Sequence, residues 1–198
     1  MGVQDAAPLA VAGPEAHDGA VRKLLLLAGS TIVLVVLLAA SLRLLGAGSV
    51  WFAFLVVWLP MAWLGTVSRL VTPRLWPGWH TLRPFERDGR VYALLGVRVV
   101  KGLLRRGPLA VFNPDLHLPT ETTPERLGHL EQRMCDAEAT HVILFVAMLG
   151  VVALEIAAGN RAAAVWIVVF DVMVNGYPVM LQRYNRALLH QRYDDLFA

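Results

Sequence analysis

The sequence predicts an all-α integral membrane protein, a bundle of four transmembrane helices with one amphipathic helix at the cytoplasmic interface. Mean hydropathy is +0.55, and 57% of the 198 residues are hydrophobic, against about 45–50% in ordinary soluble domains. The excess lies in four long apolar runs, and a helix needs roughly 20 apolar residues to cross a hydrocarbon core about 30 Å thick. The Lys and Arg residues between the runs fall almost entirely on one side of a four-helix topology.

The four spans are predicted at about residues 24–45, 50–71, 140–158 and 162–182. Residues 24–42 and 50–68 contain no charged residue at all. The third and fourth spans contain one acidic residue each, Glu155 and Asp171. Uncharged runs of this length are typical of helices that cross a bilayer rather than of helices in a soluble core.

The basic residues predict which side of the membrane each loop occupies. Four spans place both termini and the loop at residues 72–139 on one side, which carries every Lys and Arg except Arg43 and Arg161. Because Lys and Arg accumulate on the cytoplasmic side of short loops, we expect cytoplasmic N- and C-termini. The Ala-, Leu-, Val- and Arg-rich composition suggests a GC-rich bacterial genome, so we expect a multi-pass protein of a bacterial plasma membrane. Residues 1–20 are expected to form a disordered tail, and residues 21–198 a single membrane domain.

The cytoplasmic loop contains the predicted amphipathic helix, at residues 88–106. Apolar residues at helical spacing form one stripe of this helix, and basic residues form another. The stripes are Tyr92, Leu95, Val99 and Leu103, and Arg98, Lys101 and Arg105. Such a helix suits the headgroup plane of a membrane with anionic lipids. A solvated helix packed on the membrane helices is an equally good interpretation.

A second loop helix is predicted to start at Pro124, with Thr123 as its N-cap, and to continue into the third span. It places two carboxylates, a thiol and an imidazole along one side of the helix where it enters the membrane. These four residues are Glu131, Cys135, Glu138 and His141.

The fourth span carries a polar stripe that starts with Asp171 near its middle. A charged side chain there costs about 2.5–3.5 kcal/mol, so the carboxyl group must be protonated, paired or facing a wet cavity. The stripe continues with Asn175, Pro178 and Gln182 and ends in Arg183, Tyr184, Asn185 and Arg186. Polar residues of this kind can simply join neighbouring helices, at about 0.6 kcal/mol each. With Glu138 and His141 entering from the same side, the stripe favours a functional site.

Several kinds of chemistry lack their sequence signals. A single cysteine, Cys135, excludes an intramolecular disulfide and a cysteine metal cluster, and we interpret it as a small buried apolar residue. The pair Glu138-x-x-His141 occurs once, whereas a di-metal bundle needs it twice, so we predict no metal. His190 and Asp195 match the spacing of a glycerolipid acyltransferase motif, which we interpret as chance. No nucleic-acid-binding motif is present, and membrane topology accounts for the positive charge.

Three stretches together resemble the glycosyl-4,4'-diaponeurosporenoate acyltransferase family. Residues 83–92 read RPFERDGRVY, residues 131–141 read EQRMCDAEATH, and residues 175–186 read NGYPVMLQRYNR. The family comprises small bacterial membrane proteins, and its type member esterifies the sugar of a glycosylated carotenoid acid with a fatty acyl chain. The resemblance covers residues 76–186 and implies acyl transfer to a hydroxyl of a lipid-linked or glycosylated acceptor of the isoprenoid or carotenoid kind.

On this hypothesis His141 deprotonates the acceptor hydroxyl, Glu138 orients the imidazole, and Asn175 with Gln182 stabilises the developing oxyanion. Lys101 is expected to bind an anionic acyl donor, such as an acyl-CoA phosphate, together with two arginines of the third stretch. The full set of predicted substrate-binding residues is Glu86, Tyr92, Lys101, Glu131, Asp171, Gln182, Arg183, Tyr184, Asn185 and Arg186. No cofactor is expected besides the donor, and the expected partners are membrane lipids and the amphipathic substrate.

Two other functions stay open at the level of sequence. In one, the chain is a non-catalytic membrane subunit, and its polar residues serve assembly. In the other, it is a different lipid-modifying membrane enzyme, such as a reductase with a nicotinamide cofactor. The sequence leaves the acceptor, the acyl length and the oligomeric state open.

Overall fold

The structure, a computed structural model, describes residues 14–68, 70, 72–76, 78–106 and 123–197, and all secondary structure in them is helical. Four of its helical stretches are long and apolar enough to cross a membrane, as the sequence predicts. The elements are α1 (Pro14–Leu45), α2 (Val50–Val67), η1 (Pro84–Glu86), α3 (Arg90–Leu94), α4 (Val97–Arg106), α5 (Pro124–Ala157), α6 (Arg161–Asp171), η4 (Val172–Gly176) and α7 (Tyr177–Phe197).

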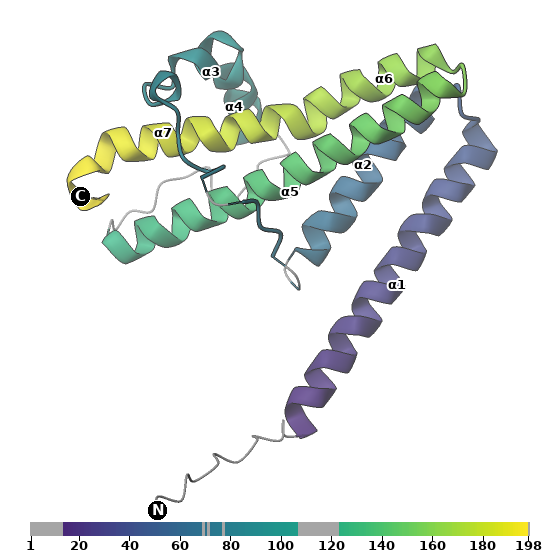
Figure 1. The fold of residues 1–198 in the computed structure, drawn as a ribbon, viewed down its shortest axis with the longest axis horizontal. Helices are drawn as coiled ribbons and strands as arrows, with labels where there is room; N and C mark the ends of the chain where they lie inside the picture. The colour runs from purple at the N-terminus through teal and green to yellow at the C-terminus, as the bar shows by residue number, and fades with distance from the viewer. Residues whose placement is uncertain (1–13, 69, 71, 77, 107–122, 198) are drawn as a thin grey trace, which may run out of the picture.

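Two long helical arms, α5 and the continuous α6–η4–α7, form an antiparallel hairpin at the centre of the molecule (Figure 1). The turn between them contains Gly159 at φ 82°, a conformation that glycine adopts without strain. The predicted N-terminus of α5 is confirmed, since the Thr123 side chain accepts a hydrogen bond from the backbone of Arg126 and Pro124 is the first helical residue. Both arms extend well beyond the predicted spans, and this polar extension carries the site described below.

The first two helices complete the membrane part. α2 packs against α6 and α5, whereas α1 packs on α2 and diverges from the hairpin (Figure 1). Ala53 and Val57 of α2 lie in one buried cluster with Met148 and Ile167 of the hairpin. α1 starts at Pro14, so residues 14–20 are helical and do not belong to a disordered tail. The rest of that predicted tail, residues 1–13, lies outside the described residues.

The predicted single helix over residues 88–106 is wrong, because it is broken into α3 and α4. Gly96 at φ 80° separates the two, and a left-handed residue cannot continue a right-handed helix. The break also divides the predicted apolar stripe. Tyr92 turns inward and packs with Val97, Leu181 and Tyr184, while the rest of the stripe stays exposed. α3 and α4 are therefore fixed to α7 on one side and present apolar side chains on the other.

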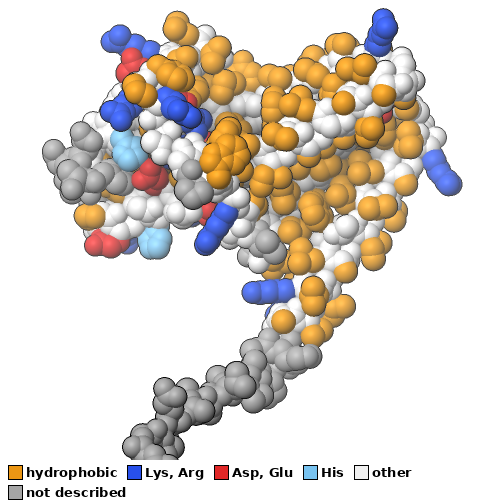
Figure 2. All heavy atoms as spheres, in the orientation of Figure 1, with side chains coloured by type: hydrophobic (Ala, Val, Ile, Leu, Met, Phe, Trp, Pro, Cys, Tyr) orange, Lys and Arg blue, Asp and Glu red, His pale blue; other side chains and the backbone are white. Residues whose placement is uncertain are grey.

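Polar and apolar side chains separate along the hairpin (Figure 2). Acidic and histidine side chains gather at the end where α5 begins and α7 finishes, and hydrophobic side chains cover most of the remaining visible surface. This distribution matches a hairpin with one end in the bilayer and the other in an aqueous phase.

Candidate functional site

A cluster of buried charged side chains joins α5, α7 and the segment before α3. Arg183, Arg186, Glu138 and Glu86 are each no more than 9% exposed. Arg183 donates from Nε and Nη2 to the two oxygens of Glu86 at 2.7 and 2.8 Å, and from Nη1 to Glu138 at 2.7 Å. Arg186 donates to the other oxygen of Glu138 at 2.5 Å. Two guanidinium groups thus balance two carboxylates, and charge-assisted pairs of this geometry are among the stronger polar contacts.

The turn that contains Trp79 and His80 closes this cluster. The Trp79 indole donates to Glu138 at 3.0 Å, and the His80 ring lies 3.4 Å from the same carboxylate. Arg183 donates to the backbone carbonyl of Trp79 at 3.1 Å, and Arg186 donates to that of His80. A segment with little secondary structure of its own is in this way fixed to the hairpin by charged donors.

Glu86 and Tyr92 have strongly shifted pKa values inside the cluster. Burial alone would raise the pKa of Glu86, but hydrogen bonds from Arg183, from the Tyr92 hydroxyl and from the Arg83 backbone outweigh it and lower the pKa to about 2. Burial and the hydrogen bond to Glu86 raise the pKa of Tyr92 to about 12. At neutral pH, Glu86 is therefore a carboxylate and Tyr92 a neutral phenol that donates to it.

A second polar group lies deeper along the hairpin, where α5 meets the π-helix η4. His141 Nδ1 is 3.1 Å from the amide oxygen of Asn175, whose nitrogen donates to Asp171 at 2.8 Å. Asn175 and Asp171 are fully buried. Because the Asn175 nitrogen faces Asp171, its oxygen must accept from His141, so we assign the proton of a neutral imidazole to Nδ1. Nε2 then carries a lone pair and can accept a proton. Short π-helices such as η4 are frequent at functional sites.

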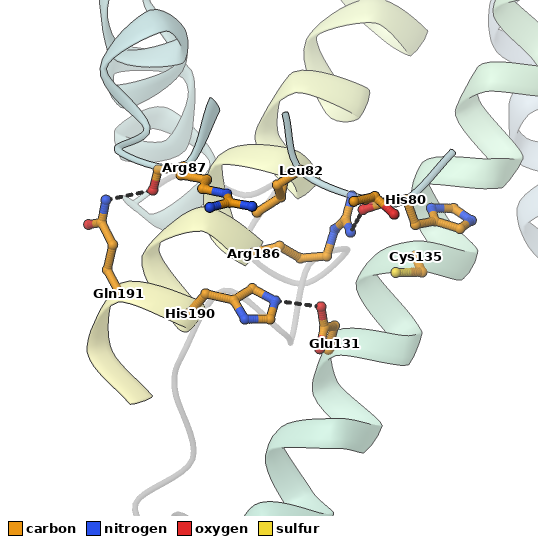
Figure 3. Close-up of a pocket in the computed structure, with 9 residues that line it drawn as sticks. His80, Leu82, Arg87, Glu131, Cys135, Arg186, His190 and Gln191 are labelled. Carbon is orange, nitrogen blue, oxygen red and sulfur yellow. Dashed lines mark hydrogen bonds and ion pairs between the residues drawn. The ribbon is translucent and has the colours of Figure 1, made fainter. Parts of the chain in front are cut away.

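A pocket of about 700 Å³ opens beside the charge cluster, between the ends of α5 and α7 (Figure 3). His190 on α7 and Glu131 on α5 point toward each other and both line it, with Nε2 2.7 Å from the carboxylate oxygen. The side chains of His80, Arg87, Cys135 and Arg186 also line it. Thr81, Leu82 and Gln191 complete its wall, so the pocket combines charged and polar groups with apolar surface.

Comparison with known proteins finds a family match over the part of the chain just described. A sequence model of the glycosyl-4,4'-diaponeurosporenoate acyltransferase family matches residues 77–194. The chain belongs to this family. Neither a curated protein nor a solved structure matches it. The match includes the charge cluster, the His141 group and the pocket, and it leaves out α1 and α2.

Two of the three predicted catalytic residues contact each other in the structure, and the third forms its contacts elsewhere. His141 contacts Asn175, as a shared site requires. Glu138 does not orient His141, because its two oxygens accept hydrogen bonds from Arg183, Arg186 and Trp79. Two guanidinium groups compete for a carboxylate more strongly than one neutral imidazole does. The residue that orients the imidazole is Asn175, which is itself held by Asp171.

The predicted donor-binding residues are largely occupied by contacts inside the family fold. All three guanidinium nitrogens of Arg183 bind carboxylates or carbonyls. Lys101 Nζ donates to Asn185 at 2.6 Å and lies 5.4 Å from the centre of the Tyr184 ring, whose hydroxyl accepts from Arg98 at 3.2 Å. These side chains dock α4 on α7. Gln182 of α7 is half-buried and lies two helical turns from Asn175 of η4, too far along this arm for the two to share one oxyanion.

Sequence reasoning missed the pocket residues His80, Arg87 and His190. One signal was available: His190 follows Arg186 by four residues and Glu131 precedes Glu138 by seven, so each lies on the same face of its helix as a cluster residue. Cys135, interpreted from the sequence as a buried apolar residue, is half-buried at the pocket wall. Among the described residues, no group of three or more His, Cys, Asp or Glu side chains is placed to bind a metal ion.

Proposed function

We propose that this protein is a membrane acyltransferase that esterifies a hydroxyl of an amphipathic, glycosylated lipid of the isoprenoid or carotenoid kind. Its family membership supports acyl transfer, and the family name supports the class of acceptor. The observation that carries the mechanism is the chain of hydrogen bonds from His141 through Asn175 to Asp171. It gives one imidazole a fixed orientation and a defined tautomer, which a general base needs.

The proposed reaction begins when Nε2 of His141 takes the proton of the acceptor hydroxyl. The hydroxyl oxygen attacks the acyl carbonyl of the donor, and a tetrahedral intermediate forms. When it collapses, the bond between the carbonyl carbon and the leaving group breaks, and the leaving group takes the electron pair and the proton from His141. Asn175 accepts from Nδ1 throughout, and Asp171 holds Asn175, so both are positioning residues.

The location of His141 suits a lipid acceptor. It lies at the start of the predicted third span, residues 140–158, and Asn175 lies within the predicted fourth, so we expect the base at the depth of the bilayer edge. A glycolipid whose tail stays among lipid chains can present its sugar hydroxyl at that depth. Both termini and the polar end of the hairpin then face the cytoplasm of a bacterial plasma membrane, as the distribution of Lys and Arg favours.

The test is a His141→Gln variant of the full chain in lipid nanodiscs, supplied with acyl-CoA and a glycosylated carotenoid acid. Product is measured by mass spectrometry as the acceptor plus one acyl group. General base catalysis contributes about 10²–10⁴-fold, so the variant should lose transfer by at least about 100-fold. His129→Gln, an exposed histidine on the same helix, is the matched control and should keep its activity.

Thermal unfolding of both variants separates lost chemistry from lost folding. A His141→Gln protein that folds and transfers as well as the wild type contradicts the proposed base. If cells lacking the gene also show unchanged lipids, the result favours a non-catalytic membrane subunit instead.

A further inference from the structure

The pocket between the ends of α5 and α7 contains a buried, unused donor. Arg186 is 2% exposed, donates from Nη1 to the His80 carbonyl and from Nη2 to Glu138, and lines the pocket. Its Nε–H is buried and has no hydrogen-bond partner among the described residues. Leaving a buried donor unpaired costs about 1–3 kcal/mol, and more for a charged group, so this atom calls for a ligand oxygen.

The other groups around this donor favour an anion. Arg87 contributes a second guanidinium from the segment after η1, and its backbone carbonyl accepts from Gln191 of α7 at 2.7 Å, which fixes that segment against the pocket (Figure 3). Among the described residues that line the pocket, the one acidic side chain, Glu131, directs its carboxylate to His190 at 2.7 Å. Guanidinium groups match the geometry of phosphate oxygens, and about 700 Å³ lies within the usual 300–1,000 Å³ range of small-molecule pockets.

The distance to His141 restricts which phosphate ligand can serve the reaction. Glu131, at the pocket, precedes His141 by ten residues on the same helix, which corresponds to about 15 Å of rise. A donor with its phosphate in the pocket and its carbonyl at His141 therefore needs a long linker between the two. An acyl thioester on a phosphopantetheine arm has such a linker, whereas the ester carbonyls of a phospholipid lie only a few bonds from its phosphate.

We propose that this pocket binds the phosphate end of a phosphopantetheine-type acyl thioester, with Arg186 Nε–H and the Arg87 guanidinium as donors to its oxygens. The inference deepens the proposed function and rests on it for the position of the carbonyl. It names the activated donor and separates the donor site from the acceptor site, which lies on the membrane side of the charge cluster.

The experiment measures binding of CoA itself to the full chain in phosphatidylcholine nanodiscs, so no transfer step is involved. Arg87→Gln should weaken binding by at least about tenfold, the value of one charge-assisted contact. Arg90→Gln, a neighbouring exposed arginine paired with Asp88, is the matched control and should bind CoA normally. Arg186→Lys keeps a cation beside Glu138, removes Nε–H and should also weaken binding.

His141→Gln distinguishes the two proposals, because it should abolish transfer and leave CoA binding unchanged. CoA affinity that is the same in wild type, Arg87→Gln and Arg186→Lys overturns the donor site, even if His141 proves to be the base. Replacing part of the phosphatidylcholine with phosphatidylglycerol tests the other source of phosphate. Competition by this lipid, with acyl groups transferred from it when no CoA thioester is present, also overturns the proposal.

Discussion

The α1–α2 pair and the α5–α7 hairpin are both apolar enough to cross a membrane, yet they bury very different side chains. Nearly all of α1 from residue 19 onward is exposed, and the one buried polar residue in that stretch, Ser41, donates to the carbonyl of Leu38 in the same helix. The hairpin buries two arginines, one acid and two asparagines that contact residues on other elements, namely Arg183, Arg186, Glu138, Asn175 and Asn185. The family match covers the hairpin and leaves out α1 and α2. Both regions thus share the apolar length of membrane spans, whereas buried polar contacts between elements lie in the part that the family match covers.

The largest effect should follow from removing a charge in the hairpin. Arg183→Ala leaves Glu86 and Glu138 buried without their shared partner, and breaking a buried ion pair costs about 3–5 kcal/mol. Thermal or denaturant unfolding in detergent measures the loss. Val33→Ala, at an exposed position of α1, should change stability by less than about 0.5 kcal/mol. An equal loss of unfolding free energy in the two variants would show that buried charge does not distinguish the hairpin from α1.

The next effect concerns activity rather than stability. Asn175→Ala removes the acceptor that orients His141, so the general base is still present but no longer held in place. We therefore expect kcat to fall by more than about tenfold, a smaller loss than removal of the base itself, while KM changes little. Steady-state transfer assays give both constants. Ser41→Ala removes the buried hydroxyl of α1 and should leave both unchanged. A rise in KM with an unchanged kcat would instead assign Asn175 to substrate binding.

Acid should weaken the hairpin end through Glu86. Its pKa falls from an ordinary 4.5 to about 2 on folding, so its contribution is fully present above pH 4.5 and is lost as pH drops toward 2. The free energy of unfolding, measured across this window, should therefore decline less steeply in Glu86→Gln than in the wild type. Parallel curves for the two proteins would mean that Glu86 is not the group that titrates.

The smallest effect tests the break between α3 and α4. Gly96→Ala places a side chain at φ 80° and should destabilise the protein by about 1–2 kcal/mol. Gly102→Ala, inside α4 with open space around its Cα, should be neutral or stabilise by up to about 1 kcal/mol. Unfolding midpoints of the pair give the difference, and a continuous helix through residue 96 would reverse its sign.

The amino-acid sequence by itself determined the helices, because their signals are local. Apolar runs of bilayer length predict the four spans, Thr123 with Pro124 predicts the start of α5, and three short stretches identify the family. The sequence also identified His141 and Asn175 as candidate site residues, because a polar side chain is costly to bury without a partner. The break at Gly96 was not predicted, because a periodic pattern continues through one glycine as easily as it stops there.

Only the tertiary structure decided which polar groups meet. Arg183 and Glu86 are 97 residues apart, and Arg183 and Glu138 are 45 apart, so no periodicity within one helix relates them. From the sequence, Glu138 could contact either His141, three residues away, or the arginines of another helix. Because α7 packs on α5, its carboxylate accepts hydrogen bonds from the arginines. The pocket arises for the same reason. His190 and Glu131 become neighbours, and Arg186 keeps an unused donor, only because two helices and one turn are held in a single arrangement by buried charge.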